Sequence, residues 1–249
     1  MITAMDDTRF TLSSIRDMAQ EARSMAVRAR NKNQHPSLQK HTPTHDEAVE
    51  SLKNIRQLLG TYLELATRDS KTERGLQMEL GYCLGALGSL MRDAGKFTEA
   101  ISYYAAGRAC EVRVKTLGGT SNSYCLVQEL VARLLLAPEA LHEKGPVNDG
   151  LHAAAREVMV QIQDDRMRDP WAYADLALLT QLIYPEQAIL FWGRLDEFRP
   201  LKLIYDSIYH VLQLLYRALE QQLNLQERME WQKTIARFEE AAMYAFANE

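Results

Sequence analysis

Glycine and proline are scarce in this chain, with 12 Gly and 7 Pro among 249 residues. This scarcity excludes collagen-like and low-complexity chains and argues against a turn-rich β fold. Long apolar runs are also missing, since no run approaches the ~18 residues that a membrane span needs. Asp6, Asp7 and Arg9 stand where a signal peptide would be apolar. From the sequence we therefore expect a cytoplasmic protein with no membrane partner.

Cysteine is rare as well. The three cysteines, Cys83, Cys110 and Cys125, are an odd number and show no C-x-x-C spacing. A disulfide framework needs paired cysteines and a zinc site needs closely spaced ligands, so neither is indicated. We expect three buried, reduced thiols.

An excess of positive charge is also absent, because 29 Lys and Arg face 33 Asp and Glu, for a net charge of −4. Such a balance argues against a general nucleic-acid-binding surface. One window departs from the average: between Arg16 and Lys40, six basic residues face only two acidic ones. We interpret this window as a solvated helix face that runs into a basic loop.

Helical periodicity is what the sequence does contain. Apolar residues recur at spacings of three and four along most of the chain, and no segment shows a convincing strand pattern. Thr44 and Glu47 resemble a capping box at the start of one helix, and Gly95 is placed to end another. The predicted helices cover residues 11–31, 48–66, 73–94, 97–115, a segment around 126–134, 148–165, 170–183, 185–197, 201–223 and 226–247.

One pair of predicted helices carries a motif of small and large residues. It reads Leu84-x2-Leu87-Gly88-x2-Met91, followed by Gly95, Ala100 and Tyr104. This motif resembles the tetratricopeptide repeat, with Leu84 and Met91 in place of the usual Trp and Tyr. A second partial copy reads Ala188-x3-Trp192-x7-Pro200. An unrelated helical bundle with a chance match is the alternative.

The resemblance implies an all-α fold, an α-solenoid of stacked antiparallel helical hairpins. On this interpretation residues 1–70 form an N-terminal helical hairpin packed on the solenoid or leading into it. Residues 71–249 then form the tetratricopeptide-like repeat domain with its C-terminal capping helices.

A second likeness concerns the stretch DPWAYADLALL and the residues around Trp192 and Tyr205. It is similar to the closing segment of the repeat region upstream of the kinase domain in apoptosis-signal-regulating kinases and in some bacterial signalling or defence proteins. The likeness implies a regulatory or sensor module that works through contacts.

The tetratricopeptide register also implies a binding site. The groove side of the best repeat would present Tyr82, Ser89 and Arg92, with Gly85 leaving space between them. This set departs from the Lys and Asn residues that family members use to hold a C-terminal carboxylate. The alternative for Arg92 is that it offsets the negative end of its own helix.

Signatures of enzymes are missing: the sequence has no P-loop, no G-x-G-x-x-G opening a helix, no G-x-S-x-G and no H-E-x-x-H. His35, His41 and His45 could share a metal in principle, but a proline-containing polar loop is a poor metal site. We therefore expect no catalytic residues, no cofactor and no metal.

The functional expectation is a non-catalytic scaffold or adaptor that binds a protein or peptide segment in a concave groove. The alternative is a regulatory sensor of a signalling or defence system that binds a small ligand or an effector. The last predicted helix is apolar on more than one side, because Trp231 and Tyr244 lie off its main apolar stripe. That stripe runs through Met229, Ile235, Phe238, Ala242 and Phe246. We expect self-association through this helix, and burial against a long N-terminal helix is the rival interpretation.

Overall fold

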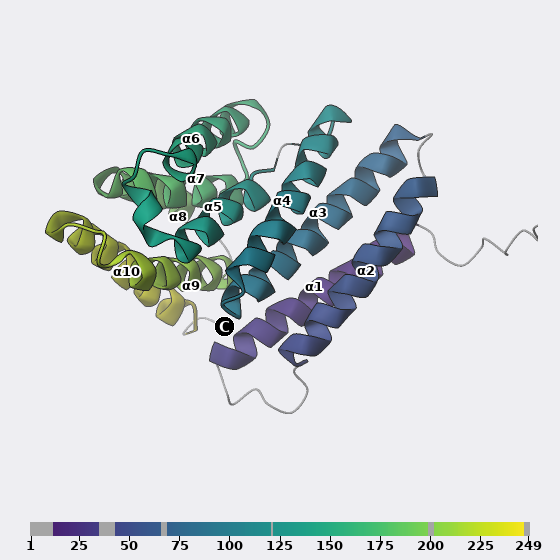
Figure 1. Cartoon of the computed structure of the whole chain (residues 1–249), viewed down its shortest axis with the longest axis horizontal. Coiled ribbons are helices and arrows are strands. Elements are labelled where there is room, and N and C mark those ends of the chain that lie inside the picture. The colour runs from purple at the N-terminus through teal and green to yellow at the C-terminus, as the bar shows by residue number, and fades with distance from the viewer. Residues whose placement is uncertain (1–11, 35–42, 66–68, 121, 199–201, 247–249) are drawn as a thin grey trace, which may run out of the picture. The chain divides into compact units, whose positions relative to one another are not determined.

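The computed structural model describes residues 12–34, 43–65, 69–120, 122–198 and 202–246 (Figure 1). Within these ranges the chain forms ten α-helices, two short 3-10 helices and no strand, which confirms the predicted all-α class. The helices are α1 (Leu12–Gln34), α2 (His45–Leu65), α3 (Ser70–Asp93), α4 (Phe97–Thr116), α5 (Tyr124–Leu136), η2 (Pro138–Leu141), α6 (Pro146–Asp164), α7 (Pro170–Ile183), η3 (Pro185–Gln187), α8 (Ala188–Glu197), α9 (Lys202–Leu219) and α10 (Leu225–Phe246).

Two compact units divide the chain, residues 1–120 (unit 1) and residues 121–249 (unit 2). The division differs from the boundary expected after residue 70. The reason is that α1 and α2 both pack on α3, so the N-terminal hairpin and the helical pair α3–α4 form one body. In Figure 1, α3 lies between α4 and the α1–α2 pair.

The helix ends of unit 1 follow from local sequence. At the start of α2, the Thr44 amide donates to the Glu47 carboxylate at 2.7 Å, and the Glu47 amide donates to the Thr44 hydroxyl at 3.2 Å. This reciprocal pair confirms the predicted capping box. Gly95 has φ +74°, and the next amide, that of Lys96, donates to the Met91 carbonyl at 2.8 Å. This Schellman arrangement ends α3 where the sequence predicts.

Close packing joins α3 to α4 at the glycine of the repeat motif. A Cβ added at Gly88 would lie 2.6 to 2.8 Å from ring carbons of Tyr104, whose side chain is fully buried. Ala100, one turn before Tyr104, is also fully buried. The hairpin therefore depends on a small residue at position 88.

Unit 2 is built around α7, which packs against α5, α6, α8 and α9. Nearly every residue of α7 after Trp171 is buried, because neighbouring helices cover it from several sides. The chain's three tryptophans all belong to this unit. Two of them, Trp192 and Trp231, are fully buried, whereas Trp171 is partly exposed.

The buried side of α10 differs from the predicted stripe. Trp231, Thr234 and Phe238 face the interior of unit 2, where Phe238 meets Trp192 edge-on at 4.9 Å between ring centroids. Met229 is exposed and Ile235 is half-buried. The side chains beyond Ala241, which the predicted stripe also included, lie outside the described residues. Self-association through α10 stays a prediction.

Cys83, Cys110 and Cys125 are all free and buried, as predicted.

Among the described residues, no helix is both long enough and apolar enough to cross a membrane.

Candidate functional site

The three predicted groove residues do not form one exposed surface. Tyr82 is 43% exposed, but Ser89 and Arg92 are each only 2% exposed. The Ser89 hydroxyl donates to the Gly85 carbonyl and lies 3.1 Å from the Tyr104 hydroxyl of α4. Because a binding residue needs accessible atoms, the predicted groove surface is wrong at Ser89 and Arg92.

Arg92 instead belongs to the interior of unit 1. It lies in the last turn of α3, where its Nε and Nη2 both donate to Asp93 Oδ1, at 3.1 and 2.9 Å. A guanidinium in the last helical turn also opposes the negative end of the helix dipole. The alternative that the sequence left open, a structural Arg92, therefore fits its position.

An acidic strip on α3 lies beside α1, and we define it by Glu79, Tyr82 and Asp93. The Arg23 guanidinium donates to Glu79 Oε2 at 2.6 Å and lies 5.3 Å from the centre of the Tyr82 ring. Arg30 forms an ion pair with Asp93 at 2.6 Å. Charge and a cation–π contact thus hold α1 against this strip.

Burial shields these ion pairs from solvent more than ordinary surface pairs. The side chains of Glu79 and Asp93 are only 8% and 14% exposed, and those of Arg23 and Arg30 are 26% and 18% exposed. Ion pairs at such positions are screened less by salt than exposed pairs. The basic window around α1 is therefore not simply a solvated face, because two of its arginines serve the α1–α3 contact.

A second polar cluster is buried in unit 2 around Arg166, in the turn between α6 and α7. Arg166 donates to the Ser123 hydroxyl at 2.6 Å, to the Gln161 side chain at 2.8 Å and to Asp169 at 2.8 Å. The Ser123 hydroxyl in turn donates to Asp175 Oδ2 at 2.5 Å. The cluster ties the start of α5 to the end of α6 and to α7.

Burial raises the pKa of Asp175 to about 6, although the Ser123 hydrogen bond and Arg166 both act to lower it. A serine, an acid and an arginine in mutual contact have the residue types of a catalytic set. Ser123 is fully buried and Asp175 is 5% exposed, so a substrate could not reach either of them in this structure. The arrangement is suited to positioning helices. An acidic residue inside the otherwise apolar run of α7 is the sequence signal that could have revealed it.

A third buried contact centres on Gln181, near the end of α7. Its Oε1 accepts from Trp192 Nε1 at 3.2 Å and from the Thr234 hydroxyl at 2.9 Å. One amide oxygen therefore links α7 to α8 and α10. Its Nε2 has no hydrogen-bond partner among the described residues.

An open cavity of about 260 Å³ lies between α9 and α10. Its lining combines two apolar side chains with a phenol, two amides and one charge of each sign, from Gln213, Tyr216, Arg217, Gln232, Ile235, Ala236 and Glu239. Gln232 Nε2 donates to the Tyr216 hydroxyl at 2.9 Å, which fixes one end of the lining. The cavity has the chemistry to hold a small polar molecule. The sequence analysis did not identify these residues.

Of the three histidines that the sequence places close together, His45 is the one that the structure describes. His35 and His41 lie outside the described residues, and His45 Nε2 lies 3.0 Å from the Leu90 carbonyl oxygen, which uses that nitrogen in a contact with α3. The described residues contain no group of three or more potential metal ligands.

Comparison with known proteins found no matching family model, no matching curated protein and no matching solved structure.

Proposed function

We propose that this chain is a non-catalytic interaction scaffold that binds a protein or peptide segment through its helical surfaces. In this proposal its hairpins stack as tetratricopeptide-like repeats, and it works in the cytoplasm, where buried, unbridged thiols are ordinary. The observation that carries the proposal is the contact of α1 with α3. There an amphipathic helix is held by small apolar side chains and ion pairs, which is a common way for one protein to recognise a helix of another.

The positions of the polar clusters support a non-catalytic role. The buried groups around Arg166 and Gln181 join helices of unit 2, and burial raises the pKa of the Cys83 thiol to about 11. A thiol with such a pKa is almost wholly protonated at neutral pH and is a poor nucleophile.

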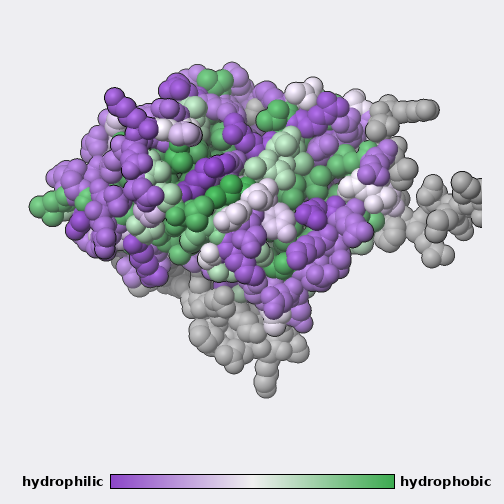
Figure 2. Space-filling view, viewed as in Figure 1, coloured by the Kyte–Doolittle hydropathy of each residue, from purple (hydrophilic) through white to green (hydrophobic). Residues whose placement is uncertain are grey.

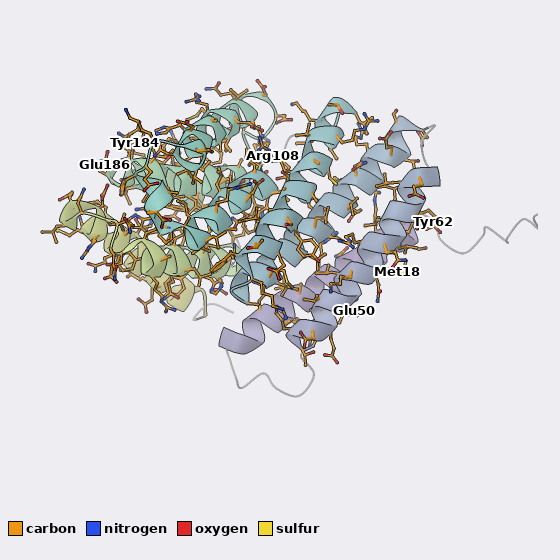
Figure 3. The ribbon with its side chains drawn as sticks, viewed as in Figure 1. Met18, Glu50, Tyr62, Arg108, Tyr184 and Glu186 are labelled. Carbon is orange, nitrogen blue, oxygen red and sulfur yellow. The ribbon has the colours of Figure 1, made fainter. Side chains whose placement is uncertain are left out.

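Tyr82 and Tyr184 provide a matched test. Both are exposed tyrosines: the Tyr82 ring contacts Arg23 in unit 1, and the Tyr184 ring, labelled in Figure 3, contacts His152 in unit 2. In quantitative affinity capture with the full chain, Tyr82→Ala should reduce the retained partner at least tenfold, and Tyr184→Ala should not. Equal retention by both variants, or no protein enriched by the wild type, would contradict the scaffold proposal.

The cavity between α9 and α10 favours a second function, a regulatory sensor that binds a small polar ligand or an effector. Arg217 and Glu239 supply opposite charges to its lining. A thermal-shift screen of the full chain against amino acids, nucleotides and short peptides tests this function. A stabilising compound should lose its effect in Arg217→Met but keep it in Arg156→Met, which changes an exposed arginine of α6. If no compound raises the melting temperature, the sensor function is wrong.

A further inference from the structure

The sequence of α1 repeats with a period of seven. From Arg16 to Arg30 it reads R-x-x-A-x-x-A twice and then ends on a third arginine, so that Arg16, Arg23 and Arg30 follow one stripe. Seven residues are close to two helical turns, which keeps such a stripe on one side of the helix. The four alanines of the repeat are Ala19, Ala22, Ala26 and Ala29, and all are buried.

The acidic strip of α3 has the complementary spacing. Glu79 and Asp93 are fourteen residues apart in the sequence, so they also fall on one side of their helix. Glu79 meets Arg23 at 2.6 Å and Arg16 at 3.9 Å, while Asp93 meets Arg30 at 2.6 Å. In this contact, a row of arginines on α1 therefore pairs with matching carboxylates on α3.

The apolar part of this contact is small. Among the described side chains of α1, the only large buried residue is Ile15, and the others are alanines. The second helix, α2, buries Leu52, Ile55 and Leu59. Because the hydrophobic contribution grows with the apolar area removed from water, α1 is held more weakly by burial than α2 and depends more on its ion pairs.

Removing α1 would leave a defined vacancy on α3. Glu79 is nearly buried, and its ion partners among the described residues are the two arginines of α1. A carboxylate at such a position needs a cation. Hydrophilic residues cover the side of α2 that faces the viewer in Figure 2, so this side offers no apolar stripe against which an amphipathic helix could pack.

We propose that the acidic strip of α3 is an exchangeable seat for a basic amphipathic helix, which α1 occupies in this structure and which a partner's helix takes by displacing α1. The partner helix carries arginines at seven-residue intervals with small residues between them, because that pattern fits Glu79, Tyr82 and Asp93. The inference rests on the scaffold function and specifies its partner class.

A labelled peptide of residues 12–34 tests the seat, with the full chain as receptor. Arg23→Gln with Arg30→Gln weakens the chain's own α1, so the peptide should bind this double variant at least tenfold more tightly than it binds the wild type. Adding Glu79→Gln to the double variant should then weaken binding at least tenfold. A control peptide with glutamine at positions 16, 23 and 30 should bind at least tenfold more weakly. No binding to a double variant that keeps native helicity would overturn the proposal.

Hydrogen exchange of the wild type covers the case in which the double variant fails to fold. The amides of α1 should exchange at least tenfold faster than those of α2 and α3, and added salt should speed exchange in α1 more than in α2. Equal exchange rates in all three helices would show that α1 is a permanent part of the core, and would overturn the proposal. A wild-type chain that sediments as a dimer and excludes the peptide would assign the seat to α1 of a second copy instead.

These outcomes separate the two proposals. If the seat fails while Tyr82→Ala still loses a captured partner, the scaffold function stands and only the partner class is wrong. If the peptide binds but capture fails, the seat stands and the scaffold function is wrong.

Discussion

Units 1 and 2 are both all-helical, but different kinds of polar contact join the helices within each unit. In unit 1, ion pairs at partly covered positions join α1 to α3 through Arg23, Arg30, Glu79 and Asp93. In unit 2, clusters inside the core join α5, α6, α7, α8 and α10. Partly covered charges respond to salt, whereas buried titratable groups respond to pH. One chain thus offers two kinds of electrostatic sensitivity.

The largest expected effect is in the buried cluster of unit 2. Arg166→Met should lower the free energy of unfolding by about 3–5 kcal/mol at pH 8, because it removes the cation beside buried acidic groups. Urea denaturation followed by circular dichroism measures the change. Arg168→Met, at an exposed position two residues away, is the control and should change stability by less than about 0.5 kcal/mol. A loss below about 1 kcal/mol for Arg166→Met would show that the cluster contributes little.

The pH dependence of the same cluster is the next largest effect. Asp175 has a pKa of about 6 when folded, against an ordinary value of 3.8. Because the folded value is the higher one, its contribution is complete below about pH 4 and is lost as the pH rises through about 6. The total loss should reach about 3 kcal/mol.

Urea midpoints measured between pH 4 and pH 8 test this dependence. Asp175→Asn should remove the decline in stability over that window. Asp164→Asn, at an exposed acid of α6, should keep it. A wild-type profile that is flat from pH 4 to pH 6 would mean that Asp175 titrates at its ordinary pKa.

Packing in unit 1 gives an effect of intermediate size. Gly88→Ala should destabilise the protein by about 1–3 kcal/mol, because the new Cβ would lie within 2.8 Å of the Tyr104 ring. Gly60→Ala in α2 is the matched control, since nothing lies within 4 Å of its added Cβ. The control should gain about 0.5–1 kcal/mol from helix propensity. Thermal or urea unfolding distinguishes the two, and a loss in both would point to general helix disruption.

Salt gives the smallest expected effect and is specific to unit 1. Raising NaCl from about 0.1 to about 1 M should cost unit 1 about 0.5–1 kcal/mol through the α1–α3 ion pairs. Glu79→Gln should reduce this dependence, because it removes the carboxylate that Arg23 meets. Glu21→Gln, which breaks an exposed pair with Arg28, should leave it nearly unchanged, because an exposed pair contributes little to stability even at low salt. An identical salt slope in all three proteins would assign the dependence to other charges.

Local features could be predicted from the sequence, and long-range contacts could not. The capping box at Thr44 and the left-handed Gly95 depend on residues three to five apart, and both are confirmed. The predicted exposure of Ser89 and Arg92 was wrong, because it depends on which helices cover α3. The repeat register implied that this side of α3 is open to solvent. Arg23 and Glu79 are 56 residues apart in the sequence, so no periodicity connects them. The same holds for Ser123 and Asp175, at 52 residues.

The placement of the tryptophans has a spectroscopic consequence. All three indoles lie in unit 2, and two of them are fully buried, so their emission should shift when that unit unfolds. The aromatic fluorophores of unit 1 are only tyrosine and phenylalanine. The helices of both units contribute to the far-ultraviolet dichroism signal. Fluorescence and dichroism transitions that do not coincide would reveal separate unfolding of the two units. A single unlabelled titration can therefore assign each loss of stability to its own half of the chain.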